Sequence, residues 1–320
     1  MAAAMRRRHQ PGKGSMNRYL FRRTAQSIFS LLALVSIVFL LSRLIGDPSV
    51  TLLPMEATAE DQAAIRALYG LDKPLYVQYL IFLKQLLTAD FGTGYYWHRP
   101  VGELLLDRLP ASLELLFWSM VVALAFAIVP GVYAAVWRGG RFDFAARTIG
   151  SLGGAIPSFW LGLVLMMIFS VWLQILPVSG RDSYASIILP ALTLGWAISG
   201  SILRLTRSSM LDVLDREYVK LARIKGVPET RVIWVHAVKN ALLPVVTFTG
   251  SIMARLLGAA IVVETVFAWP GLGRLLMQAV NARDFPVIQG IVFTLGAFQI
   301  LVSIALDIIY AWINPRIRFA

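Results

Sequence analysis

Long apolar runs recur from one end of the chain to the other, and the basic residues cluster at their ends. Six runs, at 25–45, 112–136, 149–173, 187–203, 241–267 and 287–313, are about as long as a helix that crosses a bilayer. The pattern predicts an all-α, polytopic membrane protein with about six transmembrane helices. Their even spread favours one membrane domain over residues 24–320, preceded by a basic tail at 1–23. No small-x-small cleavage site follows the first run, so we interpret it as an uncleaved span rather than a signal peptide.

The segment 46–110, between the first two runs, is polar enough to leave the membrane. Within it, residues 58–70 predict a helix that begins after the cap residue Thr58 and ends at Gly70. Residues 75–87 are apolar but too short to cross a bilayer. We expect them to form an interfacial or buried helix.

The polar stretch at 204–240 is patterned like two short helices around Gly226. An apolar face recurs at helical spacing through Leu211, Leu214, Tyr218, Leu221 and Ala222. Gly226 suits the position after a helix C-terminus, where Arg223 favours the negative end of the helix dipole. Pro228 and Glu229 suit the first turn of a second helix. The sequence therefore predicts an amphipathic helix, a turn and a returning helix.

The composition fits a chain that is mostly solvated by lipid. Apolar residues make up 58% of the 320 residues, and the mean hydropathy is +0.68. The formal net charge is +12, but the position of the basic residues favours membrane orientation over nucleic-acid binding. The chain has no cysteine, which excludes disulfides, thiol chemistry and cysteine-ligated metal sites.

The distribution of lysine and arginine predicts the orientation in the membrane. With the N-terminus inside, the inner segments (1–23, 137–147, 204–239 and 314–320) hold 20 of these residues. The outer segments (46–112, 174–188 and 268–285) hold 8, although they are longer in total. The positive-inside rule thus predicts cytoplasmic termini, a cytoplasmic loop at 204–240 and an external region at 46–110.

Residues 217–226 (EYVKLARIKG) and 236–244 (HAVKNALLP) resemble the signature cytoplasmic loop of permease subunits of ATP-binding-cassette (ABC) importers, in the dipeptide, oligopeptide and nickel branch. Residues 57–95, 156–160, 264–273 and 285–290 resemble the same branch. The general motif's glutamate–alanine–alanine positions fall on Lys220, Leu221 and Ala222, so a lysine stands where the motif has glutamate. The resemblance implies ATPase coupling through Glu217, Tyr218, Lys220, Leu221, Ala222, Arg223, Gly226, His236, Asn240 and Pro244.

The resemblance also implies an activity and a set of partners. The chain is expected to be a type I ABC importer permease in a bacterial inner membrane, and to carry peptides or a related small solute. Its expected partners are a homologous second permease, two ATPase subunits that bind ATP and Mg, and an extracytoplasmic substrate-binding protein. Dipeptide, oligopeptide, nickel chelate and glutathione remain open as cargo.

The motifs of the common enzyme classes are missing from the sequence. No glycine-rich phosphate cradle ends in Gly-Lys-Ser/Thr, and no nucleophile elbow occurs. The three histidines are isolated from one another, so we predict no metal site, no catalytic residue and no cofactor bound by this chain. His98 lies among aromatic residues that favour an interfacial belt. For His236, beside Trp234, we favour a packed structural role over a proton switch.

Two charged residues in the fifth span are candidates for the translocation pathway, Arg255 and Glu264. They are nine residues apart and thus on roughly opposite faces of a helix, so they do not pair with each other. For Glu264, the structural alternative is a bond to the turn at 269–271, which we favour. For Arg255, the alternative is a structural ion pair, with Asp307 as a candidate partner.

Two rival classes of function are weaker. A stand-alone channel or an ion-coupled secondary carrier predicts paired interior carboxylates and an internal repeat, and the sequence shows neither clearly. An intramembrane enzyme needs the motifs that are missing. The sequence therefore favours a transport subunit that takes its energy from separate ATPases.

Overall fold

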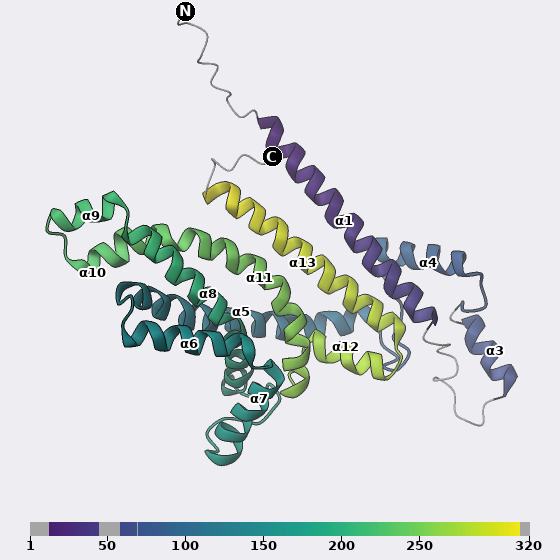
Figure 1. Cartoon of the computed structure of the whole chain (residues 1–320). Helices are drawn as coiled ribbons and strands as arrows, with labels where there is room; N and C mark the ends of the chain where they lie inside the picture. The colour runs from purple at the N-terminus through teal and green to yellow at the C-terminus, as the bar shows by residue number, and fades with distance from the viewer. Residues whose placement is uncertain (1–12, 45–57, 69, 314–320) are drawn as a thin grey trace, which may run out of the picture.

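The computed structural model describes residues 13–44, 58–68 and 70–313, and helices make up its regular structure (Figure 1). The long helices are α1 (Lys13–Leu44), α5 (Val101–Val136), α8 (Ile188–Leu214), α11 (Val238–Val266) and α13 (Phe285–Ile313). The shorter ones are α3 (Ala59–Leu68), α4 (Leu75–Thr88), α6 (Arg141–Ala155), α7 (Ser158–Met166), α9 (Glu217–Ile224), α10 (Glu229–Arg231) and α12 (Leu272–Asn281). Two π-helical turns, η1 (Met167–Trp172) and η3 (Val232–Ala237), and one 3-10 turn, η2 (Tyr184–Ile187), join them. The predicted all-α fold is confirmed.

The centre of the molecule is formed by α5, α8 and α11, which bury a common apolar cluster. Leu115 of α5, Leu194 of α8 and Ile252 of α11 are almost completely excluded from solvent. A glycine allows α5 and α8 to approach closely, because a Cβ atom on Gly195 would lie 2.6 Å from the carbonyl oxygen of Ser119. Any side chain at this crossing would force α5 and α8 apart.

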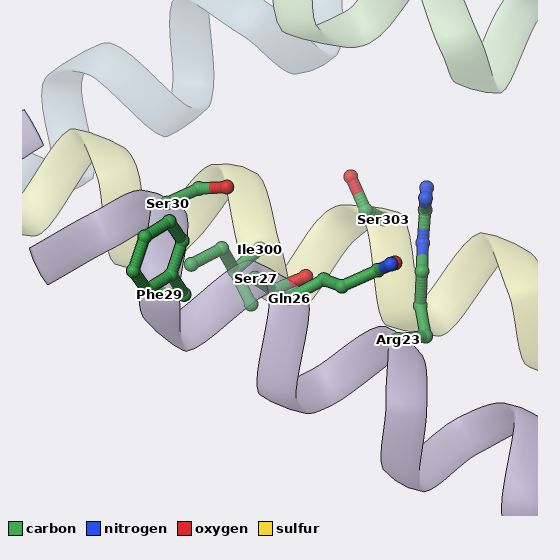
Figure 2. Close-up of a pocket in the computed structure, with 7 residues that line it drawn as sticks. All are labelled: Arg23, Gln26, Ser27, Phe29, Ser30, Ile300 and Ser303. Atoms are coloured by element: carbon green, nitrogen blue, oxygen red, sulfur yellow. The ribbon is translucent and has the colours of Figure 1, made fainter. Parts of the chain in front are cut away.

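α1 and α13 lie side by side at the edge of the bundle, as the purple and yellow helices of Figure 1. The most apolar part of α1 is only 17% buried within the chain, so most of its surface is available to lipid or to another chain. Between the two helices lies an open polar hollow of about 440 Å³ (Figure 2). In that view, Arg23 of α1 and Ser303 of α13 point to the same side of the helix pair.

Among the described residues, five helices are long and apolar enough to cross a membrane, and one bent pair can supply a sixth span. This pair occupies the expected third span, 149–173, where α6 and the α7–η1 segment meet at 104°. The expected third span is therefore formed by two helices with a sharp bend between them rather than by one straight helix. Pro157 explains the break, because the residue before a proline avoids the helical region, and Ile156 is extended with φ −86° and ψ 124°.

The ends of the helices also differ from the ends of the apolar runs. α5 begins at Val101, so its first turns lie in the segment 46–110 that was expected to be the external region. Those turns are amphipathic: Val101 and Leu104 are buried against α12 and α13, whereas Glu103 is exposed. Similarly, α1 begins at Lys13, inside the expected tail, and residues 1–12 lie outside the described part. Apolar content marks the part of a helix that meets lipid rather than where the helix ends.

The two short helices after α1 match their predictions. α3 begins after Thr58, whose Oγ1 accepts a hydrogen bond from the backbone N–H of Asp61 at 3.2 Å. The Asp61 carboxylate accepts the Thr58 N–H in return, at 2.9 Å. α4 buries Gln78, Phe82 and Leu86 on one face, and the Phe82 ring stacks on Phe39 of α1 at 5.2 Å between centroids. α4 thus has the two-faced character of an interfacial helix.

Candidate functional site

The loop between α8 and α11 extends beyond the bundle at one end, where Figure 1 shows α9 and α10. α8 ends at Leu214, and the backbone is extended at Arg216, with φ −72° and ψ 146°, before α9 begins. The sequence predicts one amphipathic helix from Leu211 to Ala222, and that prediction is wrong. The break reorients α9, so that its buried residue is Val219 rather than the expected apolar face.

α9 presents apolar side chains to the outside. Val219 is buried, and α9 packs on η3. Tyr218, Leu221 and Ile224 point elsewhere, and 44%, 50% and 81% of their surfaces are exposed. We call these three residues the α9 ridge. An apolar row that stays exposed on a charged loop is typical of a protein contact surface.

The turn after α9 depends on a glycine and an ion pair. Gly226 has a φ of +75°, which a residue with a Cβ atom rarely adopts. The Arg223 guanidinium lies 2.7 Å from the Glu229 carboxylate across the turn. The hydrogen bonds to Glu229 raise the pKa of Arg223, so the guanidinium stays charged. Because both side chains are exposed, the pair contributes at most about 1 kcal/mol to stability.

A hydrogen bond joins the two halves of the signature sequence. The Asn240 side-chain Nδ2, at the start of α11, donates to the Tyr218 hydroxyl of α9 at 3.0 Å. The same nitrogen donates to the carbonyl oxygen of His236 at 3.0 Å, which fixes the orientation of the amide. His236 itself is half-buried on η3. The position of the α9 ridge is therefore tied to the first turn of α11.

The buried carboxylate of Asp143 links α6 to α8 at the same end of the bundle. Asp143, at the start of α6, is 1% exposed and accepts two hydrogen bonds from Arg207 of α8, at 2.6 and 2.8 Å. It also accepts the backbone N–H of Gly139 at 3.0 Å, and Arg147 lies 3.3 Å away. Arg207 lies less than three turns before the end of α8. This pair therefore holds the stem from which the loop leaves.

The face of α11 turned away from the core is polar in its middle part and apolar towards its ends, where Leu243 and Val262 are exposed. Its core face carries buried residues such as Ile252, Leu256 and Val263. The other face exposes Thr247, Ser251, Arg255 and Gly258, at the three- and four-residue spacing of one helical stripe. We call these four residues the α11 stripe. Arg255 lies on it and is exposed in the isolated chain, whereas Glu264 is buried, so the two do not pair.

Glu264 is buried in a network at the other end of α11 and is 1% exposed. Its Oε1 accepts the Ser112 hydroxyl at 2.6 Å, and its Oε2 accepts the backbone N–H of Arg274 at 3.0 Å. Ser112 Oγ in turn accepts the backbone N–H of Leu272 at 2.8 Å. The carboxylate thus caps α12 at its positive end. A Cβ atom on Gly271 would collide with it, which explains the glycine after Trp269-Pro270.

Two family models match consecutive parts of the chain. The N-terminal part of the binding-protein-dependent transport system membrane component matches residues 16–116, and the inner membrane component of these systems matches residues 127–319. The chain belongs to this family. It is the permease subunit of an ABC importer and a multi-pass inner-membrane protein. Such a permease works with ATPase and substrate-binding partners, so ATP hydrolysis belongs to separate subunits.

Curated relatives and a solved structure agree with this membership. The permease is 44% identical over 305 residues to the glutathione transport system permease protein GsiC of Salmonella typhi, covering 95% of this chain and all of the relative. It is 41% identical to GsiC of Escherichia coli K12 over the same length. A structure of the MetNI methionine ABC transporter in an inward-facing conformation matches with a TM-score of 0.57, at 17% identity over 66% of this chain and 96% of that chain. That likeness supports the permease fold.

The structure brings some of the predicted coupling residues together and leaves others apart. Lys220, Leu221 and Ala222 all lie on α9 and are at least partly exposed. Pro244 lies inside α11, one turn beyond Asn240. Sequence reasoning missed Val219, Asp143, Arg207 and Ser112, whose partners are distant in sequence or hidden by the break in the loop helix. Among residues 13–44, 58–68 and 70–313, no group of three His, Asp or Glu residues could hold a metal ion.

Proposed function

We propose that this permease imports glutathione or a closely related short peptide, and that the α9 ridge receives the movement of an ATPase subunit. The cargo proposal rests on the identity to GsiC, which extends over the whole length of that relative. The coupling proposal rests on one observation: an exposed apolar ridge on a charged loop, tied by Asn240 to the helix that carries the α11 stripe.

The ridge fits a groove on a partner protein. The ridge is one face of an amphipathic helix, formed by apolar side chains at positions i, i+3 and i+6, namely Tyr218, Leu221 and Ile224. Partner grooves commonly bind a helix through such a face. The neighbouring Lys220 is exposed and adds a positive charge beside the ridge. The Tyr218–Asn240 hydrogen bond then passes a displacement of α9 to the first turn of α11.

We assign the cargo path to the α11 stripe. A charged side chain that faces lipid is costly, so the exposed Arg255 favours a water-filled path or a protein partner over lipid. Glutathione carries two carboxylates and one ammonium at neutral pH, and arginine is the side chain best suited to bind a carboxylate. Glu264, with both carboxylate oxygens bonded inside the chain, serves as scaffold beside this path.

The proposed assembly contains a second, homologous permease that covers the α11 stripe, and two ATPases that bind ATP and Mg. An extracytoplasmic binding protein delivers the cargo. The loop and both termini face the cytoplasm, which is supported by the 20 lysines and arginines of the inner segments against 8 in the outer ones. The polar hollow of Figure 2 lies on two helices that each contain a strongly apolar window, and a second chain would shield it from lipid.

The transporter, reconstituted in liposomes, tests both the cargo proposal and the coupling proposal. Glutathione should be taken up and should stimulate ATP hydrolysis. Ile224→Ser should lower stimulated hydrolysis and uptake at least several-fold, because the most exposed ridge side chain is lost. Leu87→Ser is the matched control, since Leu87 is 89% exposed on α4, far from the loop.

The outcomes separate the two claims. If neither glutathione nor a closely related short peptide stimulates hydrolysis and unrelated peptides do, the cargo proposal fails and the coupling proposal stands. If Ile224→Ser matches the wild type in both hydrolysis and uptake, the ridge is not the coupling surface.

A further inference from the structure

Two arginines lie where the short turn between α5 and α6 leads into α6. Arg138 and Arg141 are exposed, and neither makes an ion pair with another described residue. Asp143 is the one acidic residue of the segment 137–147, and it is buried against Arg207. The turn therefore carries an excess of positive charge, which attracts anions.

The two terminal segments outside the described residues do not alter this charge balance. Residues 1–12 contain three arginines, residues 314–320 contain two, and neither segment contains an aspartate or glutamate. Arginine also keeps its charge at every pH at which a protein is folded. Neither terminal segment can therefore supply the negative charge that Arg138 and Arg141 lack.

Aromatic rings flank both arginines. Trp137 precedes Arg138, and Phe142 follows Arg141. The Trp137 ring stacks on Tyr133 of α5 at 5.0 Å between centroids and meets Phe142 edge-on at 5.4 Å. Trp137 nevertheless remains 53% exposed. Because tryptophan and tyrosine concentrate where a membrane meets water, this cluster favours a position for the turn at the level of the lipid headgroups.

An exposed apolar stripe runs along α5 and ends at this turn. Its members follow one another at three- and four-residue spacing, so they lie on one side of the helix: Phe126, Val129, Tyr133 and Trp137. Phe126 and Val129 are each 46% exposed, and they belong to a helix that is apolar enough to cross a membrane. We call these four residues the α5 track. An acyl chain can lie along the α5 track while its headgroup stays at the turn.

Two features favour a lipid over a protein as the occupant of this surface. The turn is short, because α5 ends at Val136 and α6 begins at Arg141, so the arginines stay close to the end of α5. The loop with α9 and α10 extends farther from the bundle, and a subunit that docks on the α9 ridge meets that loop first (Figure 1). Paired cations at the end of an apolar stripe also match both parts of an amphiphile.

We infer that Arg138, Arg141 and the α5 track bind an anionic phospholipid. The phosphate accepts hydrogen bonds from the two guanidinium groups, and an acyl chain lies along α5. Phosphatidylglycerol fits better than phosphatidylethanolamine, because the ammonium of the latter would face two cations. The lipid would also lie beside the coupling loop, since the Tyr133 ring meets Trp234 of η3 at 6.1 Å and α9 packs on η3. Binding requires neither the proposed cargo nor the proposed role of the α9 ridge.

Native mass spectrometry of the assembled transporter tests the inference. The complex is released from nanodiscs that contain equal amounts of phosphatidylglycerol and phosphatidylethanolamine, and the lipids that remain bound are counted. The wild type should retain phosphatidylglycerol in excess. Arg138→Gln and Arg141→Gln should each lower its retention about five-fold, since one basic residue near a lipid surface changes binding by about that factor. Arg138→Lys, which keeps the charge, should retain most of the lipid.

Lys225→Gln is the matched control. Lys225 is exposed and lies in the turn after α9, so the variant removes the same charge from a loop that extends beyond the bundle. Its retention of phosphatidylglycerol should equal that of the wild type.

Four results would overturn the inference. The first is equal retention of the two lipids by the wild type. The second is unchanged retention in both Arg138→Gln and Arg141→Gln, or an equal loss in Lys225→Gln. The third is loss of the ATPase or the second permease from the Arg138→Gln complex, which would assign the turn to a protein contact. The fourth is displacement of the lipid by an equal concentration of free glycerol phosphate, which would assign the arginines to a soluble phosphate ester.

Discussion

Gly226 allows the backbone of the loop to be perturbed without a steric clash. Its φ is +75°, and a Cβ atom there would meet nothing within 4 Å. The free-energy cost of adding a side chain therefore comes from the backbone conformation alone. It is about 1–2 kcal/mol for an L-residue in the left-handed region of φ and ψ. A domain whose unfolding free energy is about 5–15 kcal/mol remains folded after such a loss. The native turn, however, becomes about 5- to 30-fold less populated relative to alternatives.

Gly226→Val should therefore leave the permease assembled and lower cargo-stimulated ATP hydrolysis and uptake by roughly this factor, because α9 is re-aimed. Gly226→Asn is the control, since asparagine tolerates the left-handed conformation better than other residues. It should retain most of the activity. Both are measured in the reconstituted transporter, with assembly checked by size-exclusion chromatography. Wild-type stimulation in Gly226→Val would refute the reasoning, and an equal loss in both variants would show that the side chain, rather than the backbone, blocks docking.

Three further predictions concern the membrane part and its orientation. Asp143→Asn removes the buried negative charge that pairs with Arg207 and should lower the unfolding free energy by about 3 kcal/mol, visible as a lower melting temperature of the purified permease. An unchanged melting temperature would count against this pair as an anchor. Arg255→Met should preserve assembly but change glutathione uptake, whereas normal uptake would remove Arg255 from the path. In intact cells, an impermeant thiol reagent should label a cysteine at Thr58 and not one at Glu229; the reverse pattern would invert the proposed topology.

Much of the fold could be predicted from sequence because lipid imposes simple rules. Apolar runs of bilayer length mark the long helices, and a capped polar segment marks α3, whose cap forms between Thr58 and Asp61 as expected. Gly226 could be predicted as a turn because glycine adopts a positive φ more readily than any residue with a Cβ atom. These signals are local, so a single sequence contains them.

The remaining features depend on contacts between distant parts of the chain. Ser112 and Glu264 are 152 positions apart, and Asp143 and Arg207 are 64 apart, so no spacing rule links them. The buried side of α9 was also unpredictable, because the break at Arg216 rotates the helix relative to α8. Helical spacing through such a break no longer reports which face is covered.

Pro244 connects the first turn of α11 flexibly to the rest of the helix. A proline has no N–H, so the carbonyl of Asn240, four residues earlier, loses its helical hydrogen bond. The residue whose side chain holds α9 thus belongs to a turn that is joined flexibly to the rest of the helix. We expect α9 and this turn to tilt together as one rigid body about Pro244. The part of α11 that lies in the membrane then reorients more slowly than they do. Pro244→Ala would restore the hydrogen bond to the carbonyl of Asn240 and make the start of α11 more rigid. If this variant hydrolyses ATP and transports cargo normally, flexibility at Pro244 is not needed.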